Sequence, residues 1–338
     1  MRWDDITRRA LGLGGGGTVA LERDPRPRGK IGLALGAGAA RGWAHIGVLR
    51  VLERAGIVPD VIAGCSVGAV VGGCHAAGKL DEVEAFARSL DKRRVMGLLD
   101  FHIGGSGLIA GDRLRRLLER DLSERRIEDL PVRFAAVATE LGTGHEIWLT
   151  RGPLVDGMRA SYALPGLFDP VKLGRRWLMD GALVNPIPIT AARALGADVV
   201  LCVNLNGDLR LRGTVIQPSE PDVEPDEMVE AVMDEPRRWG LFNPMLDAAE
   251  RLRRGGRKAV GPGIASVMVD AFNITQDRVA RSRLAGDPPD AMVCPKLAGI
   301  GLFEFHRAAE AIELGRAAAE RSLPDILDLV GEPARAAG

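Results

Sequence analysis

The chain has 338 residues, more than an average domain, although a single α/β unit can reach this size. Lysine plus arginine and aspartate plus glutamate number 45 each, and this balance gives no support to a nucleic-acid partner, whose backbone calls for a basic face. The four cysteines show no metal-type spacing, and no apolar run reaches the roughly 18 residues of a membrane span. We therefore expect no metal, no cofactor and no spanning helix, in a protein of the reducing cytoplasm.

The first 29 residues differ in texture from the rest of the chain. They are charged, then contain "GGGG", and end in "RDPRPRGK", so we expect a flexible leader. An arginine pair before a weakly apolar stretch resembles a twin-arginine export signal only faintly, because glycines dilute the apolar part and no small-residue cleavage site comes after it. The prediction is a cytoplasmic chain, with peripheral contact with the inner membrane surface as an option.

From residue 31 the sequence alternates between strand and helix patterns. "IGLAL" (31–35) and "PDVIAGC" (59–65) predict buried strands, and helical spacing follows each of them over 43–56 and 66–80. This strand–helix–strand–helix order predicts parallel pairing.

The remainder continues the α/β pattern with one interruption. An acidic, proline-rich texture at 207–262 predicts a mobile loop or insert. The other predicted elements are a hairpin of strands at 132–141 and 145–150, a strand at 197–205, and helices at 111–122, 186–196, 264–284 and 306–321.

A glycine-rich loop, "LGAGAARGWAHIG", follows the first predicted strand. Gly36, Gly38 and Gly42 allow close approach of a ligand to the backbone, and the helix after the loop directs N–H groups towards it. A dinucleotide fingerprint needs glycine where Arg41 stands, so nucleotide binding is a weaker interpretation than an anion-stabilising loop. Simple turn chemistry is the third alternative.

The stretch "GCSVG" lies between the second predicted strand and a helix of small residues. Gly64 and Gly68 flank Ser66 as in a nucleophile elbow, where a sharp bend exposes the serine at the carboxyl edge of the sheet. A tight turn without chemistry is the plain alternative. Cys65 is a rival nucleophile, but its side chain should point away from that of Ser66.

A serine nucleophile needs a base, and two candidates stand out. Of the five histidines, only His306 comes late enough for a Ser–Asp–His order. Asp180 follows an apolar strand in "WLMDGALVNPIP", although Asp–Gly alone is most often a turn.

These motifs together resemble the patatin-like phospholipase family. The resemblance rests on "LGAGAARGWAHIG", "GCSVG" and "DGALVNPIP" in this order and spacing, and on the tail "ARSRLAGDPPDAMVCPKLAGIGLFEFHRAAEAIELGR". It implies a three-layer α/β/α fold with a mainly parallel central sheet over about 30–321, leaving a tail at 322–338. It also implies a serine esterase that hydrolyses (lyso)phospholipids or similar lipids.

The resemblance also assigns roles. It makes Ser66 the nucleophile and Asp180 its base in a Ser–Asp dyad without histidine, and it places the oxyanion hole in the loop of Gly38, Ala39, Ala40 and Arg41. Many members have glycines where this chain has alanines at 37 and 39, and alanine is costly where φ is positive. Arg41 either adds positive charge or ties the loop to the sheet.

Two further segments are candidates for lipid contact. "SYALPGLFDPV" (161–171) offers Leu164, Leu167 and Phe168 for an acyl pocket, with core packing as the alternative. "WGLFNPMLDAAERLRRGG" (239–256) suits an interfacial helix or one packed on the domain itself. The alternative function is a catalytically weak regulatory or partner-binding protein of the same fold. The sequence indicates no oligomeric state.

Overall fold

The computed structural model describes residues 29–98, 111–122, 124–207 and 264–331. The predicted flexible leader, the predicted loop at 207–262 and the segment 239–256 lie almost wholly outside the described residues, and so does the end of the tail. These expectations stay predictions.

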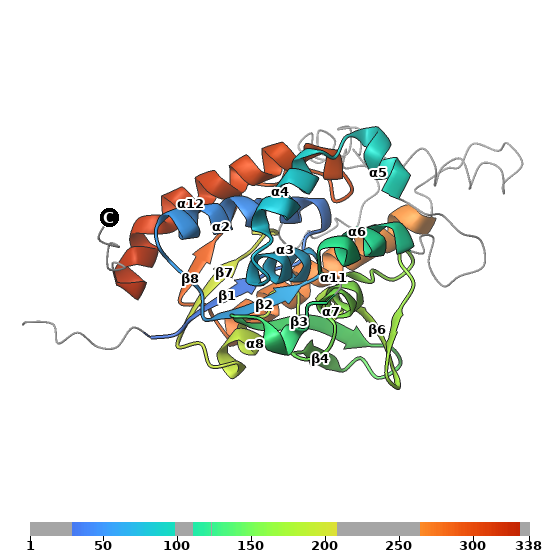
Figure 1. Cartoon of the computed structure of the whole chain (residues 1–338), viewed down its shortest axis with the longest axis horizontal. Coiled ribbons are helices and arrows are strands. Elements are labelled where there is room, and N and C mark those ends of the chain that lie inside the picture. The colour runs from blue at the N-terminus through green and yellow to red at the C-terminus, as the bar shows by residue number, and fades with distance from the viewer. Residues whose placement is uncertain (1–28, 99–110, 123, 208–263, 332–338) are drawn as a thin grey trace, which may run out of the picture.

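A central sheet of eight strands organises the chain (Figure 1). Their order is β5-β6-β3-β2-β1-β7-β8, with β4 also paired to β3. The strands are β1 Ile31–Leu35, β2 Val61–Cys65, β3 Arg133–Glu140, β4 Glu146–Leu149, β5 Val171–Leu173, β6 Arg176–Asp180, β7 Val199–Val203 and β8 Ala291–Val293.

The strands from β8 to β3 pair in parallel, whereas β4, β5 and β6 are antiparallel to their neighbours. The central parallel strands β1 and β2 are buried over their whole length, which their continuous apolar sequences predict for strands covered on both faces. The mainly parallel sheet is confirmed.

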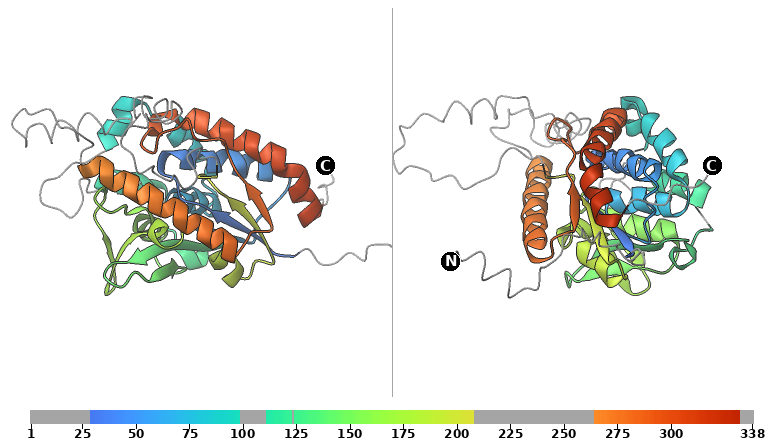
Figure 2. Two further views of the ribbon diagram at one scale, coloured as in Figure 1. Left: turned by 180° about the vertical axis from the view of Figure 1, so that it is seen from behind. Right: turned by 90° about the vertical axis from the view of Figure 1, so that its left-hand side faces the viewer.

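Helices cover both faces of the sheet and complete an α/β/α sandwich (Figure 2). Helices α2, α3, α4 and α12 pack on one face through a large aliphatic core, while α8 and α11 cover the other through a smaller, alanine-rich one. The helices are α2 Ala44–Arg54, α3 Val67–Ala76, α4 Leu80–Arg88, α5 Lys92–Leu98, α6 Asp112–Leu122, α7 Leu154–Tyr162, α8 Ile189–Ala194, α11 Ile264–Gly286 and α12 Ala308–Val330.

Short 3-10 helices connect several of these elements: η1 Ala39–Trp43, η2 Ile127–Asp129, η3 Gly181–Leu183 and η4 Phe305–Arg307. Within the described ranges, no helix has both the length and the apolar character needed to span a bilayer.

Helix α12 packs against α2 backbone to backbone. A Cβ at Gly47 would lie 2.0 Å from the carbonyl oxygen of Ile312, and a Cβ at Gly315 would lie 2.0 Å from that of Ala44. Only glycine permits this approach. The predicted helix at 306–321 is too short, because α12 continues to Val330 and buries Ile326 completely. The boundary predicted at residue 321 thus falls inside a helix.

Three strands pair with β3, although a strand has only two edges. Strand β4 pairs with residues 136–139 and therefore overlaps both other partners, whereas β2 pairs with residues 133–137 and β6 with 138–140. Strands β2 and β6 must therefore share one edge of β3. They run in opposite directions along it and meet with their carboxyl ends opposite Val137 and Ala138.

Candidate active site

Ser66 occupies a sharp bend between β2 and α3. Its φ of 55° and ψ of −122° are strained for a residue with a side chain. A Cβ at Gly64 would lie 2.5 Å from the Cα of Ala69, and one at Gly68 would lie 2.2 Å from the carbonyl oxygen of Leu35. Both glycines are thus required by close backbone packing, and the bend leaves the Ser66 side chain facing a cavity.

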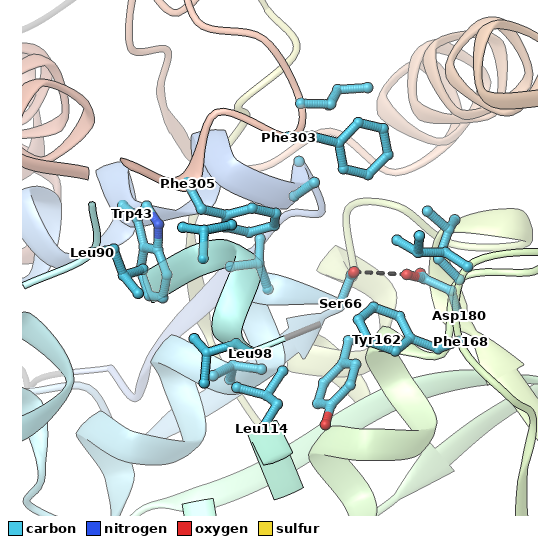
Figure 3. A pocket seen from close by; sticks show the side chains of 18 of the residues that line it. Trp43, Ser66, Leu90, Leu98, Leu114, Tyr162, Phe168, Asp180, Phe303 and Phe305 are labelled. Atoms are coloured by element: carbon cyan, nitrogen blue, oxygen red, sulfur yellow. Dashed lines mark hydrogen bonds between the residues drawn. The ribbon is translucent and has the colours of Figure 1, made fainter. Parts of the chain in front are cut away.

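Asp180 ends β6 and lies beside Ser66. The Ser66 hydroxyl donates to Oδ2 of Asp180 at 2.7 Å, and the Ala182 N–H donates to Oδ1 at 2.8 Å (Figure 3). The Asp180 carboxyl is 2% exposed. Burial raises its pKa from 3.8 to about 6, against the lowering effect of these two hydrogen bonds. The carboxyl is thus ionised at pH 7 but far more basic than an exposed aspartate.

Neither rival group joins this pair. Cys65 is fully buried in the core on the α8 and α11 face, where burial and the nearby Asp180 charge raise the pKa of its thiol. His306 lies in η4 beside Glu304 and Arg307, and no histidine of the described residues hydrogen-bonds to Ser66. Of the five histidines, only His102 lies outside the described residues.

The glycine-rich loop between β1 and η1 faces the same cavity. Gly38 and Ala39 line it, and within the described part of the chain their N–H groups have no acceptor. Ala40 donates its N–H to the Leu302 carbonyl at 2.9 Å, and Arg41 donates its N–H to Gly38 at 3.1 Å. Ala40 and Arg41 therefore present no free N–H to the cavity, which corrects the expectation for these two residues.

The Arg41 side chain ties the loop to later parts of the chain. Its Nε donates to the carbonyl of Ile300 at 2.8 Å, and Nη1 lies 3.5 Å from the Asn206 side-chain oxygen. Ala39 has a φ of 47°, so the predicted cost of alanine at positive φ applies here. The sequence motifs did not single out Val67, which comes directly after Ser66, lines the cavity and has no acceptor for its N–H among the described residues.

A largely apolar cavity of about 170 Å³ extends from the dyad (Figure 3). Leu164, Leu167 and Phe168, which the sequence singled out for an acyl pocket, all line it. Helix spacing alone did not reveal the larger part of the wall, which comes from η1, α3, α4, α5, α6, η4 and the connection between α4 and α5: Trp43, Val70, Val83, Phe86, Leu90, Val95, Leu98, Leu114, Leu118 and Phe305. The polar side chains of Asn273 and Gln276 from α11 also line the cavity, together with the apolar residues Phe272, Leu302 and Phe303.

The described residues contain no cluster of histidine, cysteine and carboxylate side chains that could hold a metal ion.

Comparison with known proteins identifies the family. The family model described as patatin-like phospholipase matches residues 33–193. An NTE family protein of Mycobacterium tuberculosis, itself described as uncharacterized, is 33% identical over 87% of this chain and 91% of its own length. The chain belongs to the patatin-like phospholipase family.

Two further proteins resemble this chain less closely. Lysophospholipase nte1 of Emericella nidulans is 31% identical over 52% of this chain and 12% of its own length. A solved structure, VipD from Legionella pneumophila, aligns with a TM-score of 0.45 and 13% identity over 88% of this chain and 67% of its own. The matched range 33–193 contains the glycine-rich loop, Ser66 and Asp180, whereas α11 and α12 lie beyond it.

Proposed function

We propose that this protein is a serine esterase that hydrolyses acyl esters of lysophospholipids or similar lipids through Ser66 and Asp180. The observation that carries the proposal is the 2.7 Å hydrogen bond between the two side chains at the wall of an apolar cavity. Membership of the patatin-like phospholipase family supports a lipid substrate, and a relative named lysophospholipase supports the one-chain lipid.

The first half-reaction forms an acyl-enzyme. Ser66 Oγ attacks the ester carbonyl carbon while its proton passes to Oδ2 of Asp180. The resulting oxyanion accepts hydrogen bonds from the N–H groups of Gly38 and Ala39, and that of Val67 is a further donor. Such donors contribute about 3 kcal/mol each in other enzymes. The tetrahedral intermediate then expels the alcohol, which takes the proton from Asp180.

Hydrolysis of the acyl-serine repeats these steps with water. Asp180 accepts a proton from the attacking water, and the serine oxygen leaves with that proton as the fatty acid is released. A pKa of about 6 suits this work, because a general base is most effective when its pKa lies near the working pH. The apolar wall holds the acyl chain and keeps bulk water from the carboxylate.

The proposal also covers where the enzyme works in the cell and which residues form its catalytic unit. We propose a cytoplasmic enzyme that reaches lipid by peripheral contact with the inner membrane surface. Its catalytic unit begins near residue 30 and extends to the end of α12 at Val330, because Ile326 is part of the main core.

Hydrolysis of p-nitrophenyl esters and of lysophospholipid by purified variants tests the function. Wild type should turn over both substrates, whereas Ser66→Ala and Asp180→Asn should fall to background while remaining folded. Ser89→Ala, which changes an exposed serine, is the matched control and should keep full activity. His306→Ala should also stay active, and its inactivity would favour a Ser–His mechanism.

Labelling with a fluorophosphonate distinguishes a reactive Ser66 that lacks a suitable ester substrate from a Ser66 that is not reactive at all. A wild type that reacts with neither fluorophosphonate nor ester in the folded state would contradict the proposal and support a binding or regulatory protein of the same fold.

A further inference from the structure

A second buried serine lies behind the nucleophile. Ser161 is near the carboxyl end of α7 and is 0% exposed. Its hydroxyl oxygen accepts the backbone N–H of Ser66 at 2.8 Å and donates its own hydrogen to the carbonyl of Val137 at 2.6 Å. Both hydrogen-bonding roles of this hydroxyl are thus used in the sheet next to the dyad.

The position of this hydroxyl is explained by the way β2 ends. Cys65 is the last residue of β2 and pairs with Val137 of β3. At Ser66 the chain turns away from the sheet, so its N–H donates to Ser161 Oγ, and the Ser161 hydroxyl in turn reaches the β3 carbonyl. Ser161 thus inserts one hydroxyl into the β2–β3 ladder and prolongs it by one bridged hydrogen bond.

The bend that this bridge supports is strained. The φ of 55° at Ser66 persists only where surrounding contacts hold it. The same Val137 carbonyl packs against Gly181, where a Cβ would lie 2.2 Å from the oxygen. The carbonyl therefore lies close both to the Ser161 bridge and to the residue that follows Asp180.

We propose that Ser161 is a positioning residue that holds Ser66 in its strained conformation, so that Oγ stays directed at Asp180 and at the substrate carbonyl. This inference rests on the proposed function, since it assumes that Ser66 is the nucleophile. Ser161 does not touch the reacting atoms. Its loss should therefore slow the chemical step and leave substrate binding in the cavity unchanged.

The test compares Ser161→Ala with Val155→Ala. Val155 lies on the same helix and is 4% exposed in the same core, so its truncation weakens α7 without touching Ser66. For Ser161→Ala we expect kcat to fall on the order of 10- to 100-fold with KM within about twofold, because small misplacements of reacting groups have effects of this size. The rate of fluorophosphonate labelling at Ser66 should fall by the same factor.

Val155→Ala, measured well below its melting temperature, should keep kcat and the labelling rate near wild type. Ser161→Thr restores a hydroxyl and should recover most of the labelling rate if its melting temperature is close to that of wild type. If the threonine variant does not fold, the pair of alanine variants alone decides.

Two results would overturn the inference: a folded Ser161→Ala with kcat within threefold of wild type, or an equal loss of kcat in Val155→Ala at matched stability. Both presuppose an active, labelled wild type. A wild type without turnover or labelling would instead contradict the proposed function.

Discussion

Replacing Asp180 by asparagine should stabilise the fold while abolishing activity. The folded protein holds the pKa of this fully buried carboxyl at about 6 instead of 3.8, chiefly through burial. A raised carboxyl pKa means that the folded state binds the proton more tightly than the unfolded state does. Stability from this group is therefore complete below pH 3.8 and is lost as the pH rises through about 6.

The magnitude can be worked from the shift. A pKa difference of about two units corresponds to about 3 kcal/mol between the protonated and ionised extremes. About half of this loss falls between pH 5 and pH 8; the other half falls below pH 5, where the carboxyl of the unfolded chain is already ionised while that of the folded protein is still protonated. Asparagine carries no charge, can accept the Ala182 N–H through its oxygen, and can donate to the Ser66 hydroxyl through its nitrogen.

Urea denaturation at pH 5, 6, 7 and 8 measures the effect, with ester hydrolysis recorded on the same samples. The free energy of unfolding of Asp180→Asn should exceed that of wild type by an amount that grows from pH 5 to about pH 7 and then levels off. Asp129→Asn, which changes an exposed carboxylate, should shift stability by no more than about 0.5 kcal/mol. A variant less stable than wild type at pH 8, or a difference that does not depend on pH, would refute the reasoning.

The site supports three further predictions. The kcat/KM for a neutral ester should fall about tenfold per pH unit below about pH 6 and be level above it, because only ionised Asp180 accepts the serine proton; a profile that falls only below pH 4 would contradict the raised pKa. Ala39→Gly should raise the free energy of unfolding in urea by about 1 kcal/mol by relieving a φ of 47°, whereas Ala40→Gly, whose φ is not positive, should lower it. Leu90→Trp fills part of the cavity and should reduce hydrolysis of a long-chain p-nitrophenyl ester on the order of tenfold relative to the butyrate ester. Equal losses on both esters would show that Leu90 does not contact the acyl chain.

The sequence predicted the elements whose burial is uniform. Strands β1, β2 and β7 read as short apolar runs, because parallel strands covered on both faces need no polar alternation. The patterns missed β5 and β8, two strands of three residues each, and the helices α4, α5 and α7. Tertiary packing stabilises such short elements more than local preference does.

The site was predictable where a motif constrains the backbone. Gly64 and Gly68 mark a bend at which neither position can hold a Cβ, so the local sequence was enough to predict that Ser66 lies on this bend. The choice of donors in the loop could not, since Ala40 donates to Leu302, more than 250 residues away in the sequence. Ser161 carried no signal either, because a serine in a helix has many ordinary explanations and its two partners lie directly after β2 and within β3.

The antiparallel strand β6 explains how a serine and an aspartate meet without a third residue between them. Strands β2 and β6 approach each other along one edge of β3, and their last residues, Cys65 and Asp180, lie opposite Val137 and Ala138. The separation of Ser66 and Asp180 is therefore set by strand register, which a buried sheet fixes more firmly than a loop does.

Two hydrogen bonds from neighbouring residues also hold Asp180 in its orientation. Thr139 of β3 donates its hydroxyl to the Asp180 backbone carbonyl at 2.8 Å, and the Ala182 N–H donates to Oδ1, the carboxylate oxygen that does not bind Ser66. A slip of β6 by one residue would turn the carboxyl to the opposite face of the sheet and break its contact with Ser66. In a Ser–His–Asp site the aspartate orients a histidine side chain. Here the backbone pairing of β6 with β3 orients the aspartate itself. The antiparallel direction of β6 thus brings the Asp180 carboxyl directly to the Ser66 hydroxyl.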